Sequence, residues 1–494
     1  MSASFHLLLV LLFVKHCSFD LIEFWAFFVC DVILWTLALI PLIAVIRGYL
    51  EWFDPISLLS VFFFGMVGAF YPAYLADPEF VKIFSAYGGY GLRYSSEPEF
   101  LSLVIQAELI LGTFWAFMLV INRRRLEFSP SKFTKVEYKA ALWTSAVCLI
   151  GGIAGFFSYW HLESFLRAIT VDLGKSVSMP EWGTSRYLIL VFIATTSVSL
   201  GLVGWLNLTN RSKNQRYLTH WVVVLPALVV ALVHLWNGAR AEVLLAFLFL
   251  FIIISLFGFK IKRTTWLIAG TLCAILLGLM TIIRGNIYLA DTPGSVISQV
   301  LSGEARQSYR YLVGSDVGTL LGLDRVGVVA MVLDYQKIKG AYLYGESLAA
   351  GPVNLAADWI SRITGKGALQ TDVLRMASQV ITLWRFGFAV YGGVPPSFPG
   401  EFFMQSGLLS LLILSFVFSK IFLWLRRKVA KSESLIARWA FCSITLTVIK
   451  LASAEISPFF DTFIYYILPV LIIYGLVFAM LKVPSRFGYE MRAR

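Results

Sequence analysis

Ile283-Arg284-Gly285 ends one apolar segment of the chain, and Val394-Pro395-Pro396-Ser397-Phe398-Pro399-Gly400-Glu401 leads into another. Residues 284–400 contain amphipathic pieces, Arg and Lys residues, and Gly/Pro turns, and they form the one long stretch without the composition of a membrane segment. On both sides the chain consists of apolar runs of about 20 residues, the length that an α-helix needs to cross a bilayer. The predicted fold is an all-α polytopic integral membrane protein with one large extracytoplasmic loop.

Composition supports the same class. The chain has 494 residues, of which 59% are hydrophobic and 14% are charged. A soluble domain has about 25% charged residues, and it could not hide this much apolar surface from water. The formal net charge is +12, but the basic residues lie largely in short loops between apolar runs, as the positive-inside rule describes. The charge therefore indicates membrane topology, and no nucleic-acid partner is expected.

Twelve apolar runs are candidate transmembrane helices, and because the first is short we expect eleven or twelve crossings. The runs lie near residues 4–16, 24–46, 55–76, 100–121, 140–159, 187–208, 219–236, 241–258, 264–283, 402–425, 435–454 and 462–481.

Five clusters of Lys and Arg set the orientation of these runs. All five fall on one side if every run crosses once, and that side is expected to be cytoplasmic. The clusters lie within residues 123–139, 211–216, 260–263, 426–431 and 486–494. The sequence thus predicts a cytoplasmic C-terminus and three parts, which are N-terminal transmembrane helices (1–283), a large periplasmic loop with amphipathic helices (284–401) and C-terminal transmembrane helices (402–494).

Inside the loop, glycines separate four expected helices, near residues 296–312, 324–338, 352–363 and 370–385. The second of these contains the apolar stretch 328–333. Such a stretch is expected to lie on the membrane surface or to re-enter it. The loop is therefore expected to shape a cavity at the outer leaflet.

Four arginines are candidates for binding an anionic substrate on the predicted outer face. Arg240 lies in a turn between two apolar runs, Arg284 ends another run, and Arg362 and Arg385 lie in the large loop. The planar fork of Arg offers two parallel charge-assisted hydrogen bonds, which suits a pyrophosphate group. The alternative is that these side chains extend to lipid headgroups.

Glu401 and His234 are the candidate general bases. A partly buried carboxylate has a raised pKa and can take a proton from a hydroxyl group. The alternative for Glu401 is a helix N-cap or a partner for an Arg, since the helix dipole favours a carboxylate in a first helical turn. His234 lies about one turn before Arg240, and its alternative is a hydrogen-bonded place inside the helix bundle. The outer loops lack a DxD-type pair and no cysteine pair has metal-ligand spacing, so neither a metal nor a cofactor is expected.

Several motifs together resemble the O-antigen (Wzy-type) oligosaccharide repeat-unit polymerases. The resemblance covers roughly residues 236–410 and rests on Asn237-Gly238-Ala239-Arg240, Arg284-Gly285, Asp324-Arg325, Tyr344-Gly345-Glu346-Ser347, Ile360-Ser361-Arg362 and Pro395-Pro396-Ser397-Phe398-Pro399-Gly400-Glu401.

The resemblance implies a GT-C-like membrane glycosyltransferase of the bacterial inner membrane. Such an enzyme transfers the growing glycan from undecaprenyl pyrophosphate to the non-reducing end of a newly flipped lipid-linked repeat unit. The lipid pyrophosphate is the leaving group, so no metal is needed. In this scheme Arg284 and Arg385 hold pyrophosphate, Arg240 supports them, and Glu401 or His234 takes the proton. The expected partners are the undecaprenyl-pyrophosphate-linked oligosaccharide, membrane lipids, a chain-length regulator and a flippase.

Two related functions are alternatives. An O-antigen ligase shares many helices and one large outer loop, but ligases of that type use a His in the loop, and residues 284–400 contain none. A lipid-linked oligosaccharide flippase or transporter belongs to a class with short loops and internal pseudo-symmetry. The single long loop and the lack of a visible internal repeat argue against that class.

Overall fold

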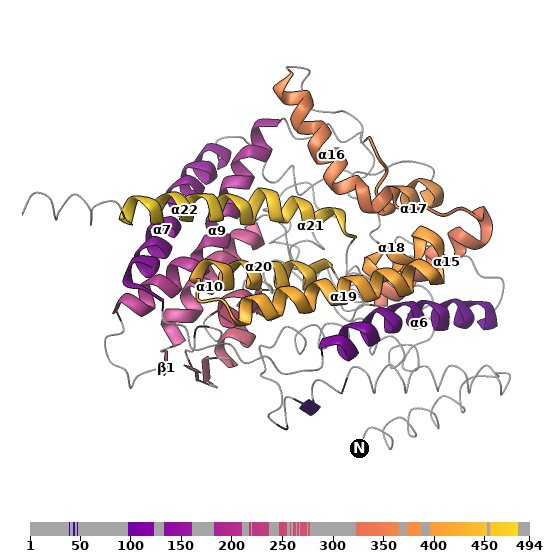
Figure 1. The fold of residues 1–494 in the computed structure, drawn as a ribbon, viewed down its shortest axis with the longest axis horizontal. Helices are drawn as coiled ribbons and strands as arrows, with labels where there is room; N and C mark the ends of the chain where they lie inside the picture. The colour runs from indigo at the N-terminus through magenta and orange to yellow at the C-terminus, as the bar shows by residue number, and fades with distance from the viewer. Residues whose placement is uncertain are drawn as a thin grey trace, which may run out of the picture. The chain divides into compact units, whose positions relative to one another are not determined.

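The computed structural model describes thirteen longer stretches and a few single positions of the chain. They are residues 97–122, 133–160, 182–209, 217–218, 220–236, 247–253, 260–262, 264–265, 267–273, 323–364, 373–386, 396–451 and 455–482, with 39, 43, 44, 47, 257, 275 and 276. Nearly all of these residues are helical (Figure 1). The exceptions include two strands of two residues each, β1 (Tyr217–Leu218) and β2 (Lys260–Ile261), which pair in parallel.

Five helices in the described part of the chain are long and apolar enough to cross a membrane. They cover Ile105–Asn122, Lys135–Phe157, Ile189–Thr209, Leu408–Ala430 and Phe459–Lys482. Two shorter apolar helices cover Trp221–Val233 and Leu435–Val448. The chain thus has the helices of a helical membrane protein, as the sequence predicted. The predicted runs near 4–16, 24–46 and 55–76 lie outside the described residues, apart from a few single positions.

The chain divides into two compact units. The first comprises Met1–Leu126, Val313–Leu425 and Thr447–Asp461, and the second comprises Glu127–Leu312, Arg426–Leu446 and Thr462–Arg494. The second unit holds α7 (Lys135–Trp160), α9 (Trp182–Thr209), α10 (His220–Trp236), most of α20 (Leu435–Leu451), the π-helical turn η1 (Phe463–Ile467) and α22 (Leu468–Lys482).

In the second unit, α7 and α9 lie side by side (Figure 1). Small residues allow the close approach, because a Cβ atom at Gly201 would lie 2.4 Å from the Cβ of Ser145. Trp439 of α20 binds α9 by donating from Nε1 to the Ser199 hydroxyl at 2.9 Å. This packing of small residues and interhelical polar contacts is typical of membrane helices.

The first unit holds α6 (Glu97–Asn122), α15 (Leu323–Lys339), α16 (Glu346–Ile363), α17 (Ala377–Phe386), α18 (Ser397–Ser406), most of α19 (Leu408–Ala430) and nearly all of α21 (Ser457–Thr462). The apolar residues Val328–Val332 of α15 are fully buried, and α15 packs against both α6 and α18. Protein helices cover this stretch, and its expected place on or in the membrane stays a prediction.

A cluster of aromatic rings joins α6, α18 and α19. Phe114 lies 6.4 Å from Phe398 and 6.1 Å from Phe402, measured between ring centroids, and Phe418 lies 5.1 Å from Phe398. Such pairs add to the stabilisation from burial. The cluster fixes α18, the helix that carries Glu401, inside the first unit.

The helices of the predicted loop are confirmed in part. The helix expected at 324–338 is α15, whereas those expected at 352–363 and 370–385 begin at Glu346 and Ala377, and 296–312 lies outside the described residues. The run predicted at 402–425 is not one helix. It is divided at Gly407 into α18 and α19, because Gly407 has φ +73° and ends α18.

Gly407→Ala is expected to destabilise the protein by roughly 1–2 kcal/mol, because an L side chain is strained at this φ. The new Cβ would also lie 3.3 Å from the Tyr342 hydroxyl. Thermal unfolding of the detergent-purified chain measures the effect. Gly475→Ala in α22, where a Cβ meets nothing within 4 Å, is the matched control. Equal unfolding midpoints for the two variants would contradict the structural role of Gly407.

Candidate functional site

Glu401 lies in the interior of the first unit, on α18. This helix follows Pro396 and begins at Ser397, a buried residue with φ +65°. A positive φ at a residue other than Gly is strained, and such strain is often found at functional sites. Glu401 lies beyond the first turn of α18, and its side chain has no exposed surface. The alternative interpretation of Glu401 as a first-turn residue is therefore wrong.

Both carboxylate oxygens of Glu401 accept hydrogen bonds. The Ser347 hydroxyl, at the start of α16, donates to Oε1 at 2.8 Å, and the backbone N–H of Ile456 donates to Oε2 at 2.7 Å. Gln405, one turn further along α18, donates from Nε2 to the Ser347 hydroxyl at 2.9 Å and to the Glu401 carbonyl at 2.8 Å. Ser347 thus has its proton directed at Glu401, because it accepts from Gln405.

Glu455 is a second carboxyl group in the same buried network. It is 5% exposed, and it directly precedes Ile456, whose amide binds Glu401. Its Oε2 accepts from the Ser378 backbone N–H at 2.8 Å, and its Oε1 accepts from the Ser378 hydroxyl. The two carboxyl groups therefore link α16, α17 and α18 with the segment that precedes α21.

Burial, together with the charge of Glu455, raises the pKa of Glu401 to about 8, against the hydrogen bonds from Ile456 and Ser347, which lower it. Burial also raises the pKa of Glu455, against the two bonds from Ser378. Neither carboxyl group pairs with a Lys or Arg among the residues that the structure describes. Near neutral pH the network therefore retains a proton, and it can exchange that proton in the range where a general base works.

The turn before α16 closes the C-terminal end of α18. Leu343 and Tyr344 donate from their backbone N–H groups to the carbonyls of Met404 and Gln405, at 2.9 and 3.1 Å, and Gly345 N–H donates to Gln405 Oε1 at 2.8 Å. These bonds satisfy carbonyl groups that a helix end leaves open. Residues 344–347 and 396–401, which are far apart in the sequence, thus meet at α18.

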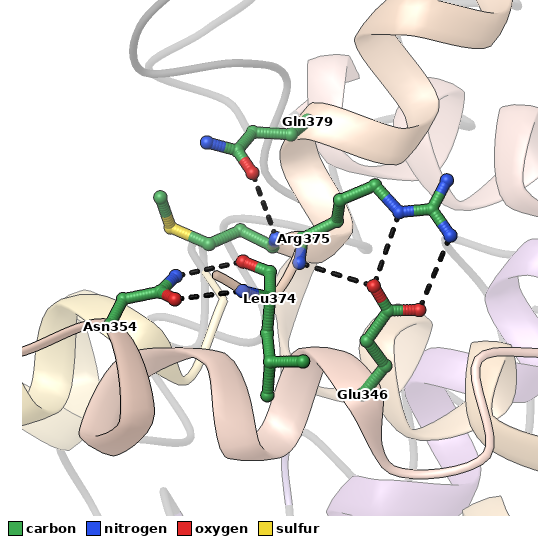
Figure 2. A network of polar contacts seen from close by, with 6 residues as sticks. Glu346, Asn354, Leu374, Arg375 and Gln379 are labelled. Carbon is green, nitrogen blue, oxygen red and sulfur yellow. Dashed lines mark hydrogen bonds and ion pairs between the residues drawn. The ribbon is translucent and has the colours of Figure 1, made fainter. Parts of the chain in front are cut away.

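A second polar network lies at the surface, where residues 373–376 are fastened to α16 (Figure 2). Arg375 donates from Nε to Glu346 Oε1 at 3.1 Å and from Nη2 to Oε2 at 3.4 Å. This pairing lowers the pKa of Glu346 and raises that of Arg375. The side-chain amide of Asn354 makes two hydrogen bonds with the backbone of Leu374. It accepts from the Leu374 N–H at 2.9 Å and donates to the Leu374 carbonyl at 2.8 Å. Residues 373–376 therefore have a fixed position against α16.

Asn354→Ala is expected to destabilise the protein by about 1–3 kcal/mol, because it leaves the N–H and the carbonyl of Leu374 without their partners. Asn354→Asp keeps the acceptor for the N–H but sets a carboxylate oxygen against the Leu374 carbonyl, so it is expected to destabilise the protein too. Thermal unfolding midpoints of both variants and of the unchanged chain measure the effects. If Asn354→Asp were as stable as the unchanged chain, the two-bond account of Figure 2 would be wrong.

The other predicted site residues lie at or beyond the edges of what the structure describes. His234, Arg362 and Arg385 belong to α10, α16 and α17, but their side chains are outside the described part. Arg240 and Arg284 lie outside the described residues altogether. Their proposed roles therefore stay predictions, and the site that the structure defines is built around Glu401.

Sequence reasoning missed the partners of Glu401. Ser347 belongs to the quoted Tyr344-Gly345-Glu346-Ser347 motif, and Gln405 lies one helical turn after Glu401, so both had a weak signal. No sequence pattern pointed to Ser378 or to the backbone amide of Ile456. Within the described stretches, no group of three or more His, Cys, Asp or Glu residues could hold a metal ion.

Comparison of the chain with protein-family models, with curated proteins and with solved structures gives no match.

Proposed function

We propose that the chain is a GT-C-like glycosyltransferase of the bacterial inner membrane that polymerises oligosaccharide repeat units of the O-antigen type. One observation carries the proposal. Two of the stretches on which the resemblance rests, 344–347 and 395–401, meet through the hydrogen bond from Ser347 to Glu401. The apolar helices supply the membrane setting that a lipid-linked substrate requires.

In the proposed reaction, a hydroxyl oxygen at the non-reducing end of the new repeat unit attacks the anomeric carbon of the growing glycan. The bond between that carbon and the pyrophosphate oxygen breaks, and undecaprenyl pyrophosphate leaves with the electron pair. The hydroxyl proton passes to the ionised form of Glu401, which is the minor form near neutral pH and, with a pKa of about 8, a stronger base than an ordinary carboxylate. Because Glu401 has no exposed surface, substrate binding must open the network around it.

The proposed pyrophosphate site uses Arg284 and Arg385, with Arg240 and Arg362 in support. The guanidinium groups would bind the diphosphate oxygens and offset the charge that develops as the lipid carrier leaves. His234 is the second candidate for the base. The partners in this scheme are the lipid-linked oligosaccharide, membrane lipids, a chain-length regulator and a flippase.

Gel profiling of surface glycan in a deletion strain tests the proposal. The deletion is expected to leave a single repeat unit on the lipid core, and complementation with the intact chain is expected to restore the ladder. Arg284→Ala, present in the membrane at the normal level, is expected to behave like the deletion. An unchanged ladder in the deletion strain would refute the polymerase function.

A proton-coupled transporter of lipid-linked oligosaccharide is a second candidate, and the buried carboxyl pair favours it. Ionisable residues inside membrane proteins often form proton relays in transporters. This function differs from polymerisation in the same gel assay, because an untransported repeat unit never reaches the lipid core. Loss of the single repeat unit together with the ladder would support the transporter, or a ligase, over the polymerase.

A further inference from the structure

An aromatic pair lies between α15 and α17 in the first unit. The rings of Tyr335 and Trp384 meet edge to face, with centroids 5.5 Å apart and an interplanar angle of 77°. Both side chains are half-buried, so part of each ring remains accessible. The edge-to-face contact fixes the orientation of the rings. Two ordered, partly exposed rings from different helices form a rigid platform.

An exposed ion pair lies next to this platform. Arg375, which pairs with Glu346, lies near the phenol group of Tyr335. Its side chain is 61% exposed and that of Glu346 is 28% exposed. Glu346 engages two of the five guanidinium N–H groups. The other three remain as donors, and the Glu346 bonds hold them in a fixed place.

This combination matches the chemistry of a sugar ring. A pyranose has a face of C–H groups, which packs on an aromatic ring, and a rim of hydroxyl groups, which bind charged donors and acceptors. The charge of Arg375 is offset by Glu346, so the pair suits neutral hydroxyl groups better than a phosphate. We propose that Tyr335, Trp384, Glu346 and Arg375 form a saccharide-binding subsite.

The subsite and the buried carboxyl network share two consecutive residues of α16. Glu346 directly precedes Ser347, whose hydroxyl donates to Glu401. A saccharide bound to Glu346 therefore contacts the first turn of α16, the turn from which Ser347 reaches Glu401. That the saccharide is the glycan of a lipid-linked repeat unit rests on the proposed function, whereas the subsite itself rests on the platform and the ion pair.

The test uses the full chain in lipid nanodiscs and an oligosaccharide of one repeat unit, released by mild acid from the surface glycan of the host. Binding is followed by saturation-transfer difference NMR. Trp384→Ala is expected to weaken binding about tenfold, the equivalent of roughly 1.4 kcal/mol. Arg375→Gln is expected to weaken it as well. Unfolding midpoints show that each variant remains folded.

Trp359→Ala is the matched control, because Trp359 lies on α16 and is 48% exposed without belonging to the platform. It is expected to bind the oligosaccharide as the unchanged chain does. The subsite is refuted if the unchanged chain binds no oligosaccharide, if folded Trp384→Ala binds equally well, or if both Trp variants lose binding alike.

The glycan ladder of the deletion strain separates this inference from the proposed function. A ladder that depends on the chain, with binding that does not depend on Trp384, refutes the subsite and leaves the polymerase proposal standing. If the ladder does not depend on the chain but binding does depend on Trp384, the polymerase proposal is refuted. The chain is then a saccharide-binding membrane protein with a different function.

Discussion

Glu401→Gln is expected to stop glycan extension, lowering the rate of repeat-unit addition by at least about a hundredfold, while the protein stays folded. The amide oxygen of Gln can accept from the Ile456 N–H, and its amide nitrogen can donate to the Ser347 hydroxyl oxygen. The contact with Ser347 is kept with its direction reversed, and only the Ser347 O–H loses its acceptor. What the substitution removes is the group that takes the proton. Glu401→Gln thus separates chemistry from folding.

The rate is measured as ladder growth after a pulse of labelled repeat unit in the deletion strain that carries each variant. Glu433→Gln makes the same chemical change at an exposed carboxyl group between α19 and α20, and it is expected to extend glycan at the normal rate. Glu401→Ala is the contrasting variant, because it leaves Ser347 and Ile456 without an acceptor and is expected to lower protein abundance too. Normal extension by Glu401→Gln would exclude Glu401 as the base.

The folded protein is expected to lose stability as pH rises from about 5 to 9. The pKa of Glu401 is about 8 in the folded protein, against an ordinary value of 4.5. Below 4.5 both folded and unfolded chains hold the proton, so the contribution is fully present there. Between 4.5 and 8 only the unfolded chain ionises, and stability falls with pH; above 8 the loss is complete. A shift of this size corresponds to roughly 5 kcal/mol.

Unfolding midpoints of the detergent-purified chain across this pH range test the expectation. The Gln side chain in Glu401→Gln cannot ionise, so this variant is expected to remove most of the dependence of the unfolding midpoint on pH. Glu433→Gln is expected to leave that dependence unchanged. Glu455→Gln is expected to reduce the slope in part, because it removes the charge that helps raise the pKa of Glu401. If the slope were the same in the unchanged chain and in Glu401→Gln, Glu401 would not be a buried group that resists ionisation.

The helices of the chain were largely predictable where the pattern is local. Apolar runs marked the long helices, and the segment 324–338 matched α15 closely. The break at Gly407 was hidden, because the apolar run continues across it and the groups that close α18 come from residues 343–345. Burial of α15 was also hidden, since a helix that packs against protein and one that packs against lipid have the same apolar composition.

The candidate site was predictable only at Glu401. The Pro/Gly-rich stretch before it indicated a special position, but its partners Ser347 and Ile456 are 54 and 55 residues away in the chain. Such contacts leave no trace in local spacing. Glu455 was visible as a carboxylate near an apolar run, yet its place beside the Glu401 network depends on how α17 and α18 pack. The predicted arginine cluster remains a prediction.

Reconstitution with purified components tests the polymerase function most directly. The detergent-purified chain is placed in liposomes with undecaprenyl-pyrophosphate-linked repeat units extracted from the deletion strain, and the lipid-linked products are separated by length. We expect a ladder of lipid-linked oligomers with release of undecaprenyl pyrophosphate, and single units only with Glu401→Gln. Repeat units that stay single with the unchanged chain, whether or not they cross the bilayer, would contradict the function proposed for this protein.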